Sequence, residues 1–130
     1  MKRTSTSFNE ISLFDSYLLG WEQKDQTLIL YLEAWITDIH PWYTKDRSDL
    51  FANLKLCIIE FKQISKLTGI DENPVQLPKW TKLEEYDDLM EIDDVEQFGN
   101  SLKLVGDEGA IYIEYESFSI EILEGNQFLN

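Results

Sequence analysis

Carboxylates are the side chains whose types and spacing in this sequence most invite chemistry. Residues 84–96 contain eight Asp and Glu side chains and no lysine or arginine. An EF-hand calcium loop needs spaced oxygen ligands, a glycine at its turn and a closing glutamate, and this cluster contains no glycine. We reject an EF-hand. Three interpretations remain: a looser Mg²⁺ or Ca²⁺ site, a docking face for a basic protein, and a solvated acidic surface.

The other reactive residues give little support for catalysis. His40 is the only histidine and precedes Pro41, so we expect a loop or surface histidine rather than a general base. Cys57, the only cysteine, lies in the apolar run 56–59 and is expected in the core. One His and one Cys do not make the three or four ligands that zinc needs. The chain is therefore predicted not to be an enzyme and to hold no metal and no cofactor.

Negative charge is concentrated in the second half of the chain. The formal net charge is −14 at pH 7, of which residues 1–67 contribute −1 and residues 68–130 contribute −13. Such a field repels nucleic acid and anionic lipid and attracts basic protein surfaces. Lys2 and Arg3 are followed by polar residues rather than by an apolar leader, and no apolar run approaches the roughly 20 residues that span a bilayer. We expect a cytoplasmic protein with no membrane or nucleic-acid partner.

The elements that must position these residues are mostly predicted to be strands. Apolar residues alternate over 27–35, and with the strand expected over 17–23 they predict a hairpin. Residues 101–105 and 110–115 predict a second hairpin around the turn 106–109. The apolar phase then shifts before 118–123, which predicts either a bulge or a separate strand. Residues 83–96 fit an exposed strand or a short helix.

Residues 51–67 fit two structures. A shared face of an amphipathic helix is predicted by the spacing of six apolar residues: Phe51, Leu54, Cys57, Ile58, Phe61 and Ile64. Residues 54–59 also suit a strand, because they are rich in β-branched side chains and bounded by polar turns. Periodicity favours the helix.

The order of these patterns resembles a group of known domains. Residues 14–18 form an Asp-containing opening strand, 59–67 follow the pattern apolar-x-Phe-x-x-Ile-x-x-Leu, and 111–114 and 118–122 end in apolar-x-apolar-Glu. In this the chain resembles small acidic β-rich bacterial domains of uncharacterised families. Some of these are regarded as immunity proteins, which neutralise a toxin made from a neighbouring gene. The resemblance implies that residues 54–67 contain strand.

We therefore predict a mainly β fold, an antiparallel sandwich or partly open barrel built from hairpins. The alternative is an α+β fold with one amphipathic helix at about 49–68. Residues 1–130 are expected to form a single domain with a loosely held N-terminus at about 1–10. Two strand tryptophans, Trp21 and Trp35, are expected in the core.

The function that follows from charge and resemblance is interaction. We expect a protein, an immunity protein by the resemblance, that binds and neutralises a basic, nuclease-like toxin. The alternative is a structural or small-ligand-binding β module without catalytic activity, and the oligomeric state is left open. The predicted partner-binding residues are an aromatic anchor and the acidic cluster: Trp80, Glu84, Glu85, Asp87, Asp88, Glu91, Asp93, Asp94 and Glu96.

Overall fold

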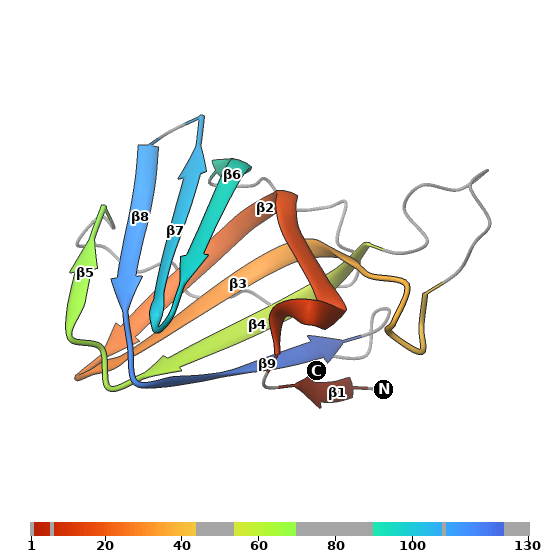
Figure 1. Cartoon of the computed structure of the whole chain (residues 1–130), viewed down its shortest axis with the longest axis horizontal. Helices are drawn as coiled ribbons and strands as arrows, with labels where there is room; N and C mark the ends of the chain where they lie inside the picture. Colours follow the sequence, from red (N-terminus) through yellow and green to blue (C-terminus); the bar gives the residue numbers. More distant parts are fainter. Residues whose placement is uncertain (1, 6, 44–53, 70–89, 108, 124–130) are drawn as a thin grey trace.

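A computed structural model describes residues 2–5, 7–43, 54–69, 90–107 and 109–123. In these ranges the chain is built almost entirely of antiparallel strands, so the predicted mainly β fold is confirmed (Figure 1). A single 3-10 turn, η1 (Phe8–Glu10), precedes the long strands. The strands are β1 (Lys2–Ser5), β2 (Ile11–Lys24), β3 (Thr27–Ile36), β4 (Leu54–Lys62), β5 (Lys66–Thr68), β6 (Met90–Phe98), β7 (Ser101–Gly106), β8 (Gly109–Glu114) and β9 (Ser117–Leu123).

The strands follow one another in a single strongly bent sheet. Their order is β1-β9-β4-β3-β2-β6-β7-β8-β5. In Figure 1 the β6, β7, β8 and β5 strands stand at a steep angle over one end of the layer formed by β2, β3, β4 and β9. The two parts of the sheet face each other across the core, as in an orthogonal sandwich.

Two connections lie at the corner between these parts, one from β4 to β5 and the other from β8 to β9. The chain passes from β4 to β5 through Gln63, whose φ of 55° is left-handed, and from β8 to β9 through residues 115 and 116. Backbone hydrogen bonds tie the two turns together: Ser65 N–H donates to Glu114 O at 2.8 Å and Glu116 N–H donates to Lys62 O at 3.0 Å. This corner explains the phase shift in the sequence, because β8 and β9 are separate strands on either side of it. The alternative of a bulge in one strand is wrong.

The inner faces of the sheet form the main core. On β3 the residues at even positions from Leu28 to Ile36 are at most 3% exposed, as the predicted alternation requires. An aromatic cluster fills the region near the corner, where the Phe61 ring centroid lies 5.0 Å from that of Tyr115 and 6.2 Å from that of Phe118. Phe8 from η1 stacks on Phe118 at 4.2 Å.

The outer face of the β2-β3-β4-β9 layer carries a second apolar cluster. Its buried members are Leu19, Tyr31, Leu56 and Leu123. The Tyr31 hydroxyl donates a hydrogen bond to the Glu22 carboxylate, and desolvation, with a smaller contribution from that bond, raises the pKa of Tyr31. The layer is therefore apolar on both sides.

The helix alternative over about 49–68 is wrong where the structure describes it. Residues 54–62 form β4, which pairs with β3 on one side and β9 on the other. Cys57, Ile59 and Phe61 face the main core, whereas Leu56 joins the outer cluster. Both faces of β4 are covered, so its sequence lacks the regular apolar–polar alternation of a half-exposed strand. The spacing of its apolar residues therefore resembles that of an amphipathic helix.

One expectation about the strand tryptophans differs from the structure. At the N-terminus, residues 2–5 form β1, which pairs with β9 from Lys2–Leu123 to Ser5–Ile120. Trp21 is buried in the main core at 6% exposure as predicted. Trp35 instead lies half-buried on β3, in register with Leu54.

Candidate partner-binding surface

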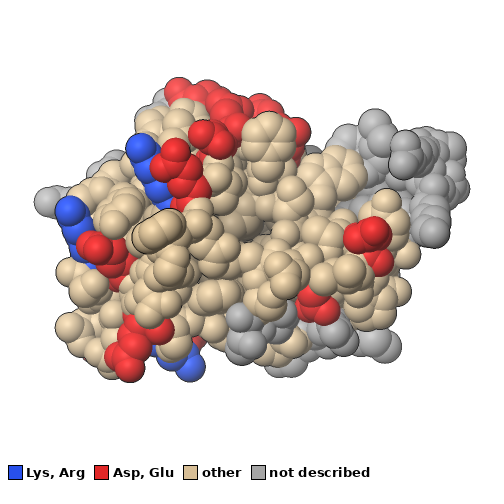
Figure 2. Space-filling model, viewed as in Figure 1, with Lys and Arg blue, Asp and Glu red and all other residues tan. Residues whose placement is uncertain are grey.

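Strand β6 carries the part of the predicted acidic face that the structure describes. Asp93, Asp94 and Glu96 are exposed and Glu91 is half-buried. Figure 2 shows carboxylates gathered over the end of the molecule where β6 and β7 lie, with few basic side chains on this face. The other predicted partner-binding residues lie outside the described residues: Trp80, Glu84, Glu85, Asp87 and Asp88.

An irregularity in β6 turns its carboxylates outward. Met90 and Ile92 are buried, so alternation alone would point Asp94 and Glu96 inward. The register with β7 shifts between Ile92 and Asp94, which inserts one extra residue into β6. After this bulge Val95 packs against the core and the acidic residues on either side of it are exposed.

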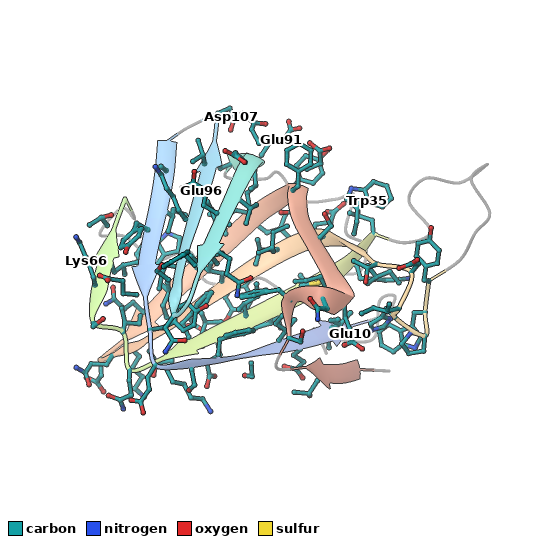
Figure 3. All side chains as sticks on the ribbon, in the orientation of Figure 1. Glu10, Trp35, Lys66, Glu91, Glu96 and Asp107 are labelled. Atoms are coloured by element: carbon teal, nitrogen blue, oxygen red, sulfur yellow. The ribbon has the colours of Figure 1, made fainter. Side chains whose placement is uncertain are left out.

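The start of β6 is held against the β7–β8 turn by two reciprocal contacts. Glu91 N–H donates to Asp107 Oδ1 at 3.1 Å, and Asp107 N–H donates to Glu91 O at 3.3 Å. Gly106 allows this approach, because a Cβ there would lie 2.3 Å from Glu91 O and 2.4 Å from Met90 Cγ. Figure 3 shows Glu91 and Asp107 close together, with Glu96 further along the strand.

These contacts add the Asp107 carboxyl group to the acidic surface. The sequence identified residues 106–109 only as a hairpin turn. The sequence signal for this contact is Gly106 next to Asp107, because a glycine has no side chain to keep a neighbouring strand away. We call Glu91, Asp93, Asp94, Glu96 and Asp107 the acidic surface.

The exposed carboxylates of β6 make no direct ion pair within the described residues. No lysine or arginine of these ranges forms an ion pair with Asp93, Asp94 or Glu96. Lys103 lies opposite Glu96 in the register of β7. The Asp94 carboxylate accepts a hydrogen bond from the neighbouring Val95 N–H at 2.9 Å. Negative charge therefore remains turned toward solvent along β6.

An exposed aromatic side chain ends the same strand. Phe98 is 87% exposed at the end of the β6–β7 hairpin. It pairs with Ser101 across a two-residue turn that begins with Gly99, whose φ of 57° is left-handed. This is the glycine position of a type II′ turn, which suits the twist of a hairpin. Sequence reasoning placed the aromatic anchor at Trp80 and missed Phe98, because its outward direction depends on the bulge.

The two residues with nucleophile or base chemistry are both buried. His40 is 2% exposed, so it lies in the predicted loop but not at the surface. Its Nδ1 accepts a hydrogen bond from Trp42 N–H at 3.1 Å, and its ring meets the Trp42 ring edge-on at 5.0 Å. Cys57 is fully buried, and desolvation raises its pKa from 9.0 to about 12. The prediction of a core cysteine is confirmed.

The described residues form no metal site, and comparison with known proteins assigns them no chemistry. Within the described ranges no three His, Cys, Asp or Glu side chains are grouped so as to hold a metal ion. In the same ranges no helix is long and apolar enough to cross a membrane. Comparison with known proteins found no matching family model, no similar curated protein and no similar solved structure.

Proposed function

We propose that this protein is a non-catalytic interaction protein that binds a basic protein partner on its acidic surface. The observation that carries the proposal is the row of exposed carboxylates Asp93, Asp94 and Glu96 on β6, none of which forms an ion pair with a lysine or arginine of the described residues. Charges presented in this way raise the rate at which an oppositely charged partner docks. The β7–β8 turn supports the row by clamping Glu91.

The partner that suits this surface best is a basic toxin, and a nuclease in particular. Enzymes that act on nucleic acid present lysine and arginine to phosphates, so a protein surface rich in carboxylates competes for the same cations. The protein would then act as an immunity protein in the cytoplasm. Phe98, exposed beside the carboxylates, supplies an aromatic side chain of the kind that dominates interface energies.

The proposal is tested with the product of the adjacent gene, co-expressed and co-purified with this protein. We expect the protein to protect cells from that product and to bind it with an association rate that falls at least about tenfold from about 0.05 M to about 0.5 M NaCl. A binding rate that salt does not change would overturn docking through the acidic surface. Protection without any complex would overturn the interaction itself.

A charge-matched pair of variants locates the surface. The triple variant Asp93→Asn, Asp94→Asn, Glu96→Gln removes three negative charges from β6. The control Asp25→Asn, Asp38→Asn, Glu116→Gln removes three from exposed positions elsewhere. We expect the β6 variant to slow association several-fold more than the control, because the potential of a charge falls off within about 10 Å in salt. Equal slowing by both variants would mean that only net charge matters.

A further inference from the structure

Strand β6 has an open backbone edge next to its acidic side chains. On one side it pairs with β7 from Ile92 to Phe98, whereas on the other it pairs with β2 only at Met90 and Glu91. Beyond Glu91 no described strand lies in register on that side. Asp93, Asp94, Glu96, Gln97 and Phe98 are all exposed, so no described residue buries the side chains of this stretch.

The bend of β2 accounts for the open edge. β2 runs beside β6 at Tyr17 and Leu18, but the residue two positions before Tyr17 is Asp15, whose φ of 62° is left-handed. The pairing of β2 with β3 is also irregular between Ser12 and Tyr17. The first part of β2 therefore diverges from β6 (Figure 1).

Strand geometry determines which backbone groups lie on the open edge. In a hairpin closed by a two-residue turn, the pair next to the turn exchanges hydrogen bonds, and every second pair does so after it. Phe98, Glu96 and Asp94 therefore direct their N–H and C=O groups toward β7. The N–H and C=O groups of Val95 and Gln97 point to the open side. The hydrogen bond of Val95 is consistent with this direction, because its N–H donates to the Asp94 carboxylate and not to a carbonyl group of β7.

The side chains of the same stretch restrict what can pair with it. Asp94, Glu96 and Phe98 lie on the outer face of β6. The strands at the two ends of the sheet, β1 and β5, carry Lys2 and Arg3, and Lys66, in their sequences. The open stretch of β6 instead carries Asp93, Asp94 and Glu96. Opposite charges on neighbouring strands stabilise a pair and like charges oppose it.

We infer that the partner adds an extended strand to the open edge of β6, with lysine or arginine at alternate positions facing Asp94 and Glu96. The inference rests on the proposed function, which it deepens by naming the mode of binding. Main-chain hydrogen bonds to Gln97 and Val95 give affinity, and the alternate side chains give specificity. The incoming strand replaces the bond between Val95 N–H and Asp94, so the Asp94 carboxylate becomes free to pair with a cation. Phe98 packs against an apolar residue at the end of the strand.

A peptide of alternating lysine and valine residues tests the inference on the full chain. We expect the peptide to slow amide hydrogen exchange of Gln97 at least about tenfold, measured by NMR, because a paired amide exchanges only on opening. Amides of β5 serve as the control, since that edge carries Lys66 and should not bind a basic strand. No slowing at Gln97 overturns the inference.

Two methylated peptides separate strand addition from attraction between charges. One carries N-methyl groups on its lysine amides and the other on its valine amides, so both keep every positive charge. In an added strand only one of these sets points toward β6, and we expect one peptide to bind and the other to lose binding. Equal binding by both overturns strand addition. It leaves docking on the acidic surface intact, because that depends on the salt-dependent binding of the basic protein.

One further outcome would mean that a second copy of this chain, and not a foreign strand, occupies the open edge of β6. If Gln97 is protected without peptide and its protection rises with protein concentration, a second copy of this chain occupies β6, and the inference of a foreign strand is overturned.

Discussion

The thiol of Cys57 is fully buried on β4, and desolvation raises its pKa from 9.0 to about 12. The folded protein therefore keeps this proton at pH values where the unfolded chain has lost it. The contribution is complete below pH 9 and is lost as the pH rises toward 12, so we expect the free energy of unfolding to fall in that range by up to ~4 kcal/mol.

Urea unfolding between pH 8 and pH 11 checks this expectation. The variant Cys57→Ala is the control, since it lacks the thiol and should lose less stability with pH while being less stable at neutral pH. An identical pH dependence for both proteins would show that Cys57 does not contribute.

Gly106 is the residue on which the shape of the acidic surface depends most. A methyl group there would overlap the Glu91 backbone and the Met90 side chain. We expect Gly106→Ala to cost ~1–3 kcal/mol and to shift the amide signals of Glu91 and Asp107. Gly99→Ala is the control: its Cβ meets no atom within 4 Å, so its cost of ~1 kcal/mol comes from the positive φ alone. An unchanged Glu91 amide signal in Gly106→Ala would contradict the close contact between Gly106 and the Glu91 backbone.

Among the strands, β4 is one that contributes side chains to both apolar clusters. Phe61 is fully buried in the aromatic cluster, whereas the neighbouring Lys62 side chain is 55% exposed and forms an ion pair with Glu60 at 3.5 Å. We expect Phe61→Ala to cost ~3–5 kcal/mol and Lys62→Ala at most ~0.5 kcal/mol, as measured by chemical denaturation. Similar costs for the two variants would be inconsistent with alternating faces on β4.

Most strands of the sheet could be predicted from the sequence, whereas β4 could not. The hairpins of β2–β3 and β7–β8 were predicted because apolar residues alternate in β3, β7 and β8 and turn residues separate the strands. The same reasoning did not identify β4, because both of its faces are apolar and the spacing of Leu54, Cys57 and Phe61 imitates a helix. The corner between β8 and β9 left a visible phase shift, but sequence alone did not show which of its two explanations applied.

The candidate site was predicted less completely than the fold. Composition identified Glu91, Asp93, Asp94 and Glu96, since a run of carboxylates needs no structural context. Asp107 and Phe98 were not identified, because one depends on a contact between distant segments and the other on a bulge that sets the direction of a side chain. Residues of these kinds become visible only once strand register is known.

At the scale of the whole molecule, a formal charge of −14 opposes compaction. We expect stability to rise with NaCl from about 0.05 M to about 0.5 M, because salt screens repulsion between exposed charges. The triple variant Asp93→Asn, Asp94→Asn, Glu96→Gln should gain ~0.5 kcal/mol at low salt and respond less to added salt. Thermal unfolding of both proteins at several salt concentrations measures this. An equal salt response would mean that the β6 carboxylates add no net repulsion.

The pairing of β1 with β9 links residues 2–5 to residues 120–123. During translation, β1 therefore cannot pair in the sheet until β9 has been synthesised. A chain with so many distant pairings has a high contact order and folds slowly compared with helical proteins of its size. While ribosomes are still making residues 117–123, the edge of β4 that β9 will occupy has no partner from this strand, and an unpaired strand edge of this kind favours aggregation.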